Sequence, residues 1–111
     1  MTAYYNSDTI LFLNGAYVKA AEAKMDFYSQ SLHYGYSVFE GIRSYKTASG
    51  ATRIFKAEAH FERLKQSAKA INMPFHWTVA ELVEAMYETL RRNGLQDAYI
   101  RPVVYAPANM S

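Results

Sequence analysis

The first regular pattern in the chain is a pair of short apolar stretches around a turn. Ile10–Leu13 and Ala16–Lys19 flank Asn14-Gly15, and this pair favours a type I′ turn, in which both central residues take positive φ. The pattern predicts a β-hairpin. Residues 20–24 are short and rich in alanine, and we interpret them as a connector rather than a helix. Residues 27–36 follow neither periodicity, so we expect an ordered loop that ends at Gly35.

Residues 36–45 predict a strand whose side chains alternate between two faces. One face carries Val38, Glu40, Ile42 and Ser44, and the other carries Phe39, Gly41, Arg43 and Tyr45. A turn at residues 46–50 and a short strand at 52–55 follow. The last strand is expected at residues 98–105, where Tyr99, Arg101, Val103 and Tyr105 share one face.

Two helices are predicted between these strands. Residues 56–71 carry an apolar stripe made of Phe61, Leu64, Ala68 and Ile71, and Pro74 follows its end. The second helix begins at Thr78 with Glu81 as its capping-box partner, and it ends at Gly94. Trp77 and Leu82 are spaced as a hydrophobic staple, and the expected core positions are Leu82, Val83, Met86 and Leu90.

This order of elements predicts an α+β fold, with a mostly antiparallel sheet and two helices packed on one face. We expect a single domain over residues 1–105 and the start of a linker at 106–111. The sheet then has a second face, open to solvent, which carries Phe39, Gly41, Arg43, Tyr45, Tyr99, Arg101 and Tyr105. Two interpretations of this open face remain. Arginines among tyrosines suit an anion attached to an apolar body, or the face packs against another domain with its arginines paired to acids.

The amino-acid composition excludes several classes of protein and of functional site. The 111 residues fit one domain, and 50% of them are hydrophobic, which excludes a disordered polar tail. The absence of cysteine excludes a disulfide scaffold, a zinc finger and a thiol nucleophile, and no metal ligands are expected. A net charge of +2 gives no basic excess for nucleic acid. Residues 1–8 lack the pattern of a signal peptide, and no stretch approaches ~20 apolar residues, so we expect a soluble cytoplasmic protein with no membrane partner.

Three ordered motifs carry a family resemblance. They are residues 33–45, His-Tyr-Gly-Tyr-Ser-Val-Phe-Glu-Gly-Ile-Arg-Ser-Tyr; residues 61–64, Phe-Glu-Arg-Leu; and residues 98–102, Ala-Tyr-Ile-Arg-Pro. With the hairpin, they resemble the N-terminal domain of the branched-chain amino acid aminotransferases, which are pyridoxal-phosphate enzymes of fold type IV. The resemblance runs from Leu11 to Pro102, nearly the whole chain.

The resemblance assigns roles to six residues. It implies that Arg63 binds the cofactor phosphate, where a guanidinium offers a planar fork of donors. It implies that Tyr99 and Arg101 lie beside the bound substrate, with Arg101 on a carboxylate, and that Phe39 and Gly41 wall the pocket for the substrate side chain. Tyr34 resembles a tyrosine that reaches into the neighbouring subunit's active site, which implies a homodimer or higher homo-oligomer. Without the family, the pattern favours a solvated helix face for Arg63 and Glu62, core for Phe39 and a bulge for Gly41.

The resemblance also implies what the chain lacks. Transamination with pyridoxal phosphate needs a lysine for the Schiff base, and in the family that lysine belongs to a second, C-terminal domain. None of Lys46, Lys56, Lys65 and Lys69 stands in a matching motif, so we expect no catalytic residue here, no stable cofactor binding and no activity from this chain alone. The full-length reaction implied is amino transfer between Leu, Ile or Val and 2-oxoglutarate. The alternatives are a D-amino acid aminotransferase, an aminodeoxychorismate lyase and a stand-alone binding module.

Overall fold

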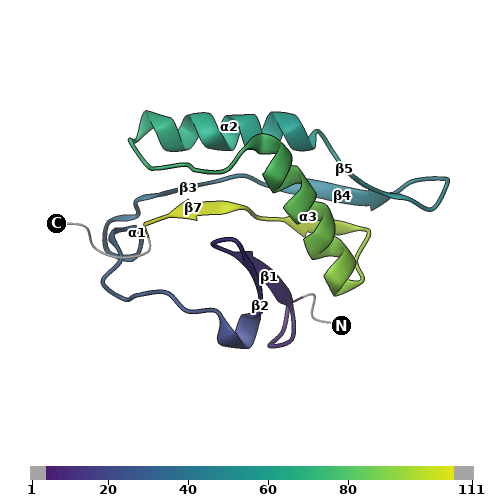
Figure 1. The fold of residues 1–111 in the computed structure, drawn as a ribbon, viewed down its shortest axis with the longest axis horizontal. Coiled ribbons are helices and arrows are strands. Elements are labelled where there is room, and N and C mark those ends of the chain that lie inside the picture. The colour runs from purple at the N-terminus through teal and green to yellow at the C-terminus, as the bar shows by residue number, and fades with distance from the viewer. Residues whose placement is uncertain (1–4, 107–111) are drawn as a thin grey trace.

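The computed structural model describes residues 5–106, apart from the side chain of His33. The elements in chain order are β1 (Ile10–Leu13), β2 (Ala16–Lys19), the 3-10 helix η1 (Ala20–Glu22), α1 (Gln30–Tyr34), β3 (Ser37–Phe39), β4 (Ile42–Lys46), β5 (Thr52–Ile54), α2 (Ala57–Ala70), α3 (Val79–Asn93), β6 (Ala98–Ile100) and β7 (Val103–Tyr105). All strand pairs are antiparallel, and α2 lies along β3 and β4 while α3 crosses toward the β1–β2 hairpin (Figure 1). The predicted α+β class is confirmed. Except for Ala106, the expected linker lies outside the described residues.

The two long strands predicted at 36–45 and 98–105 are each interrupted, which corrects the prediction. β3 pairs with β7, β4 pairs with β5 and β6, and the ladders stop at Glu40-Gly41 and Arg101-Pro102. The register is the same on both sides of the gap, because Phe39 pairs with Val103 and Ile42 with Ile100. This places Glu40 opposite Pro102. Glu40 N–H still donates to Pro102 O at 3.1 Å, but proline has no N–H to return the bond, and the ladder is broken there.

The region before β3 contains two short helices that the sequence pattern does not predict. The hairpin is confirmed, with φ of 50° at Asn14 and 92° at Gly15. The connector predicted at residues 20–24 contains η1, a 3-10 turn. The predicted loop at 27–36 contains α1, which Ser29 caps by accepting from Ser31 N–H and which Gly35 ends at a φ of 66°. A five-residue helix is too short to show a helical period, and so the prediction missed it.

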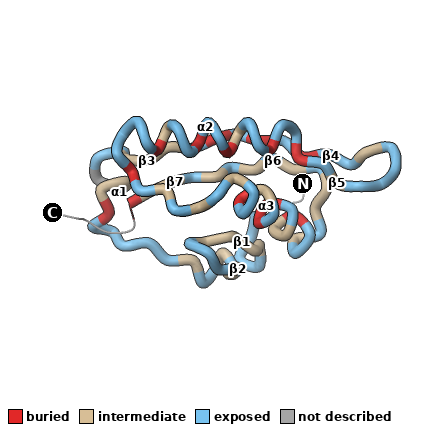
Figure 2. The backbone as a smooth tube through the Cα atoms, turned by 45° about the horizontal axis from the view of Figure 1, so that its top comes forward, coloured by how far each residue is buried: buried red, intermediate tan, exposed pale blue. Residues whose placement is uncertain are grey.

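The core lies between the inner face of the sheet and the two long helices (Figure 2). It is formed by Ile42, Ile54, Ala57, Phe61, Leu64, Leu82, Ala85, Met86 and Leu90. The predicted capping box is present, with Glu81 N–H donating to Thr78 Oγ1 and Thr78 N–H donating to the Glu81 carboxylate. Trp77 and Val83 pack against the core from partly buried positions. Ile71 was predicted in the apolar stripe, but it follows the last helical residue and is exposed.

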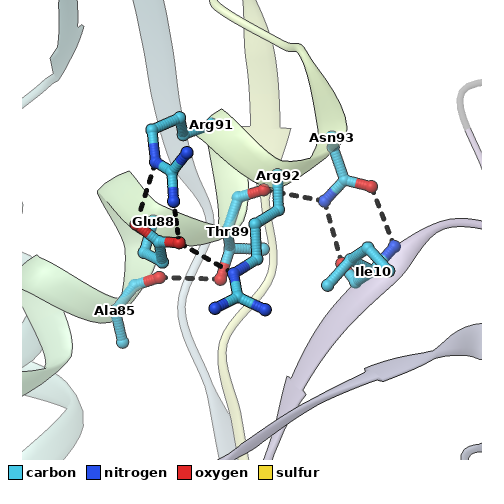
Figure 3. A network of polar contacts seen from close by, with 7 residues as sticks. All are labelled: Ile10, Ala85, Glu88, Thr89, Arg91, Arg92 and Asn93. Carbon is cyan, nitrogen blue, oxygen red and sulfur yellow. Dashed lines mark hydrogen bonds and ion pairs between the residues drawn. The ribbon is translucent and has the colours of Figure 1, made fainter.

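The end of α3 holds the hairpin in place (Figure 3). The Asn93 amide pairs with the backbone of Ile10: its oxygen accepts from Ile10 N–H at 2.8 Å, and its nitrogen donates to Ile10 O at 2.9 Å. The same nitrogen donates to Thr89 O, which keeps the amide in this orientation. One turn earlier, Glu88 pairs with both Arg91 and Arg92, and the Arg92 guanidinium lies 4.1 Å from the centre of the Tyr17 ring. Within residues 5–106, no helix is long and apolar enough to span a bilayer.

Candidate functional site

Four residues from the two interrupted strands form one cluster on the open face, called the Arg101 cluster below: Phe39, Gly41, Tyr99 and Arg101. The Arg101 guanidinium carbon lies 4.5 Å from the Phe39 ring centre and 5.3 Å from that of Tyr99. Arg101 Nη2 also donates to the Tyr99 hydroxyl at 2.7 Å. The guanidinium is therefore oriented by two rings and one hydrogen bond.

Gly41 makes this arrangement possible. A Cβ atom at position 41 would lie 2.2 Å from the Tyr99 hydroxyl oxygen, far inside van der Waals contact. Because Gly41 has no side chain, Tyr99 can lie across the strand with its hydroxyl beside Arg101. The strand gap, the glycine and the arginine thus belong to one local structure.

The Arg101 cluster can recognise an anion attached to an apolar group. Arginine has five N–H donors, and one of them is used on Tyr99. Phe39 and Tyr99 are 58% and 57% exposed, so a large part of each ring is available to an aliphatic group. Arg43 pairs across the ladder with Tyr99 and is exposed on the same face, which adds a second positive charge. This arrangement supports the first of the two interpretations of the open face.

Tyr105 corrects part of that prediction. It was expected on the open face, but it is half-buried, and its hydroxyl accepts a hydrogen bond of 3.0 Å from the Asn14 side chain. The turn of the hairpin therefore reaches β7 and covers this end of the strand.

Arg63 lies on the inner side of the sheet, on α2, and its partner is Glu40. Arg63 Nε donates to Glu40 Oε2 at 2.9 Å, and Nη2 donates to Oε1 at 2.7 Å. His60, one turn earlier on α2, places Nδ1 2.8 Å from Glu40 Oε1. The hydrogen bonds from Arg63, with a smaller contribution from His60, lower the pKa of Glu40 to about 2, although burial opposes the shift. Glu40 is therefore ionised at neutral pH and can only accept, so His60 Nδ1 carries the proton of this hydrogen bond.

The donor set of Arg63 fits a phosphate group. Glu40 occupies the edge of the guanidinium formed by Nε and Nη2. The opposite edge, with both N–H groups of Nη1 and the second N–H of Nη2, remains available for a second bidentate contact. The Arg63 side chain is 67% exposed, so an anion can reach this edge.

Tyr34 lies in α1 and is 82% exposed. It lines a shallow pocket together with Gln30, Gly35, Tyr36, Ser37, Val38 and Ile71. Ser29 and Ser31 fix this helix, because Ser29 Oγ donates to Ala106 O and Ala106 N–H donates to Ser31 Oγ. The six predicted site residues thus occupy three places: the Arg101 cluster, Arg63 with Glu40, and α1.

A family model described as amino-transferase class IV matches residues 37–109, about two thirds of the chain. The chain belongs to this family. The match covers the Arg101 cluster as well as Glu40 and Arg63.

Individual members of this family that are similar to the chain carry more specific names. The branched-chain-amino-acid aminotransferase of Salmonella typhimurium is 42% identical over 95 residues, which are 86% of this chain and 30% of that protein. The crystal structure of the Escherichia coli branched-chain amino acid aminotransferase matches with a TM-score of 0.85 and 39% identity over 92% of this chain and 33% of the other. The branched-chain aminotransferase of the thermophilic archaeon Thermoproteus uzoniensis, solved with norvaline, matches with a TM-score of 0.79 and 44% identity. This match covers 85% of this chain and 32% of the other. The chain is thus a homologue of branched-chain amino acid aminotransferases that spans about a third of their length.

Two residues next to the predicted site residue Arg63 were not predicted from the sequence: Glu40, which pairs with Arg63, and His60, which contacts Glu40. Glu40 was sorted onto the inner face with Val38 and Ile42, and a carboxylate among apolar neighbours on a buried face indicates a buried partner. That observation alone predicts a basic side chain on the covering helix. His60 left no comparable indication, because a lone histidine on a helix is compatible with many surroundings.

Proposed function

We propose that this chain is the N-terminal domain of a cytoplasmic, pyridoxal-phosphate-dependent branched-chain amino acid aminotransferase, called the full-length enzyme below. The reaction is amino transfer between leucine, isoleucine or valine and 2-oxoglutarate. The observation that carries the proposal is the Arg101 cluster, in which a guanidinium lies close to two exposed aromatic residues, Phe39 and Tyr99. It occurs in a chain that is 42% identical to a branched-chain-amino-acid aminotransferase.

The Arg101 cluster suits a site that alternates between two kinds of side chain. Glutamate and 2-oxoglutarate bring a distal carboxylate, to which Arg101 can donate hydrogen bonds from its remaining N–H groups. Leucine brings a branched aliphatic group, which packs on the exposed ring of Phe39, where each buried methylene contributes about 0.8 kcal/mol. Tyr99 keeps Arg101 in place in both cases, so the site does not have to be rebuilt between the two half-reactions.

Arg63 binds the cofactor phosphate in this proposal, through the guanidinium edge opposite Glu40. Pyridoxal phosphate, when bound, supplies the electron sink for chemistry at the amino acid α-carbon. This chain contributes binding and orientation, and the Schiff-base lysine comes from the rest of the full-length enzyme. Tyr34 projects from α1 toward the active site of a second subunit, and the enzyme is accordingly a homodimer or a higher homo-oligomer.

The proposal is tested with three candidate substrates. The full-length enzyme should transfer the amino group of L-leucine to 2-oxoglutarate, and D-alanine and aminodeoxychorismate should be poor substrates. Turnover of D-alanine or aminodeoxychorismate without turnover of leucine would assign the chain to the corresponding relative. A stop codon directly after Ser111 in the gene would instead favour the stand-alone binding module.

A further inference from the structure

Glu40 is the one carboxylate in the described core, and both of its oxygens are occupied. It is 7% exposed, and its backbone is fixed at the strand gap by the hydrogen bond from Glu40 N–H to Pro102 O. We propose that Glu40 is a positioning residue, held by His60, that orients Arg63 toward the phosphate of the cofactor. The inference rests on the proposed function of Arg63 and names the group through which that function is achieved.

The geometry supports positioning because His60 fixes Glu40, and Glu40 in turn fixes Arg63. His60 is partly buried on α2 and donates to Oε1, which fixes the rotation of the carboxylate. The carboxylate then accepts two parallel hydrogen bonds from Arg63. This pairing fixes the plane of the guanidinium and its distance from the Glu40 carboxylate. Without this contact, Arg63 would be a long, mostly exposed side chain with many rotamers. With it, the free edge of Arg63 points in one direction before any ligand arrives.

The alternative role for Glu40 is electrostatic only. A carboxylate that contacts Arg63 partly cancels its positive charge, which on its own would weaken the attraction for a phosphate. Positioning and cancellation therefore predict opposite effects when the charge of Glu40 is removed. Removal should weaken phosphate binding if Glu40 orients Arg63, and should strengthen it if Glu40 only neutralises Arg63.

The test measures cofactor affinity in the full-length apoenzyme by titration with pyridoxal 5'-phosphate and, separately, with pyridoxal, which lacks the phosphate. Glu40→Gln keeps the shape of the side chain and removes the charge. Glu40→Asp keeps the charge and withdraws it by one methylene. Glu62→Gln, at an exposed position beside Arg63 on α2, is the matched control for charge. Arg63→Ala tests the proposed function itself.

We expect both Glu40 variants to bind pyridoxal 5'-phosphate about tenfold more weakly, which matches the lower end of the loss of about 10- to 100-fold seen when the hydrogen-bond partner of a metal ligand is removed. Pyridoxal affinity and the Glu62→Gln variant should be unchanged within about twofold, and Glu40→Gln should add nothing in the Arg63→Ala background. Tighter cofactor binding by Glu40→Gln would overturn the inference in favour of charge cancellation. An equal loss for pyridoxal would reduce Glu40 to a structural residue.

The same variants distinguish a failure of the proposed role of Glu40 from a failure of the phosphate assignment of Arg63. If Arg63→Ala weakens pyridoxal 5'-phosphate binding but the Glu40 variants do not, the phosphate assignment of Arg63 holds and the role of Glu40 is refuted. If Arg63→Ala leaves the affinity unchanged, the phosphate assignment itself fails, and the inference fails with it. If Glu40→Gln does not fold, the affinity of Glu40→Asp for pyridoxal 5'-phosphate is the deciding measurement, because this variant retains the negative charge that pairs with His60 and Arg63.

Discussion

Substitution of Gly41 by alanine should disturb the site far more than the fold. The φ of Gly41 lies outside the left-handed region, so alanine can adopt the backbone conformation. The new Cβ atom would lie 2.2 Å from the Tyr99 hydroxyl oxygen and 3.0 Å from the carbon that bears it. Tyr99 must therefore move by more than about 1 Å to restore ordinary van der Waals contact.

The size of the effect follows from the contacts of Tyr99. Tyr99 is 57% exposed and its ring can swing toward solvent, so we expect the free energy of unfolding to fall by less than about 1 kcal/mol. The movement separates the hydroxyl from Arg101 Nη2, which it now contacts at 2.7 Å. An exposed hydrogen bond of this kind is worth about 1 kcal/mol, which corresponds to about a fivefold change in binding. The KM of the full-length enzyme for 2-oxoglutarate should rise by that factor.

The assay compares steady-state kinetics in two backgrounds. Gly41→Ala should raise the KM for 2-oxoglutarate about fivefold in the wild-type background, and by at most about twofold in Tyr99→Phe, where the clashing hydroxyl is gone. Thermal unfolding serves as the control for folding. An equal rise in KM in both backgrounds, or no rise in either, would refute the account of Gly41 as the residue that makes room for Tyr99.

Two further predictions concern stability. Because the pKa of Glu40 is lowered from 4.5 to about 2 in the folded state, the stabilisation by its ion pair is present above pH 4.5 and is lost as the pH falls toward 2. The difference in unfolding free energy between wild type and Glu40→Gln should shrink over that range in denaturant titrations, and a constant difference would argue against the ion pair. Asn93→Ala should destabilise the chain by about 1 to 3 kcal/mol, since Ile10 loses both partners from α3, whereas exposed Gln66→Ala should have little effect. Equal melting temperatures for these two variants would contradict the role of Asn93.

The elements that could be predicted from the sequence are those with a clear period or an explicit turn. The hairpin, α2, α3 with its capping box and the two faces of the strand at 36–45 all follow from local rules. The strand gap does not, because it depends on Glu40 facing Pro102, a pairing between residues 62 positions apart. The short α1 was missed for a different reason, since its order comes from Ser29 and Ser31 bonding to Ala106 at the other end of the chain.

For the site, the sequence predicted which residues share a face but not the contacts between their side chains. Composition and alternation placed Phe39, Arg43, Tyr99 and Arg101 on one face, and the family motifs assigned the roles. The contacts of Arg101 with two rings and the fit of Tyr99 over Gly41 are side-chain geometry, which alternation does not determine. The same holds for the partner of Arg63, because the contact joins Glu40, in the strand gap, to a helix that begins seventeen residues later.

The most direct test of a branched-chain aminotransferase function is amino transfer from L-leucine to 2-oxoglutarate, measured with the full-length enzyme as glutamate formed per leucine consumed. We expect one glutamate for each leucine, with the transfer dependent on added pyridoxal 5'-phosphate. A folded protein that binds pyridoxal 5'-phosphate and turns over D-alanine or aminodeoxychorismate, but leaves L-leucine unchanged, would contradict it.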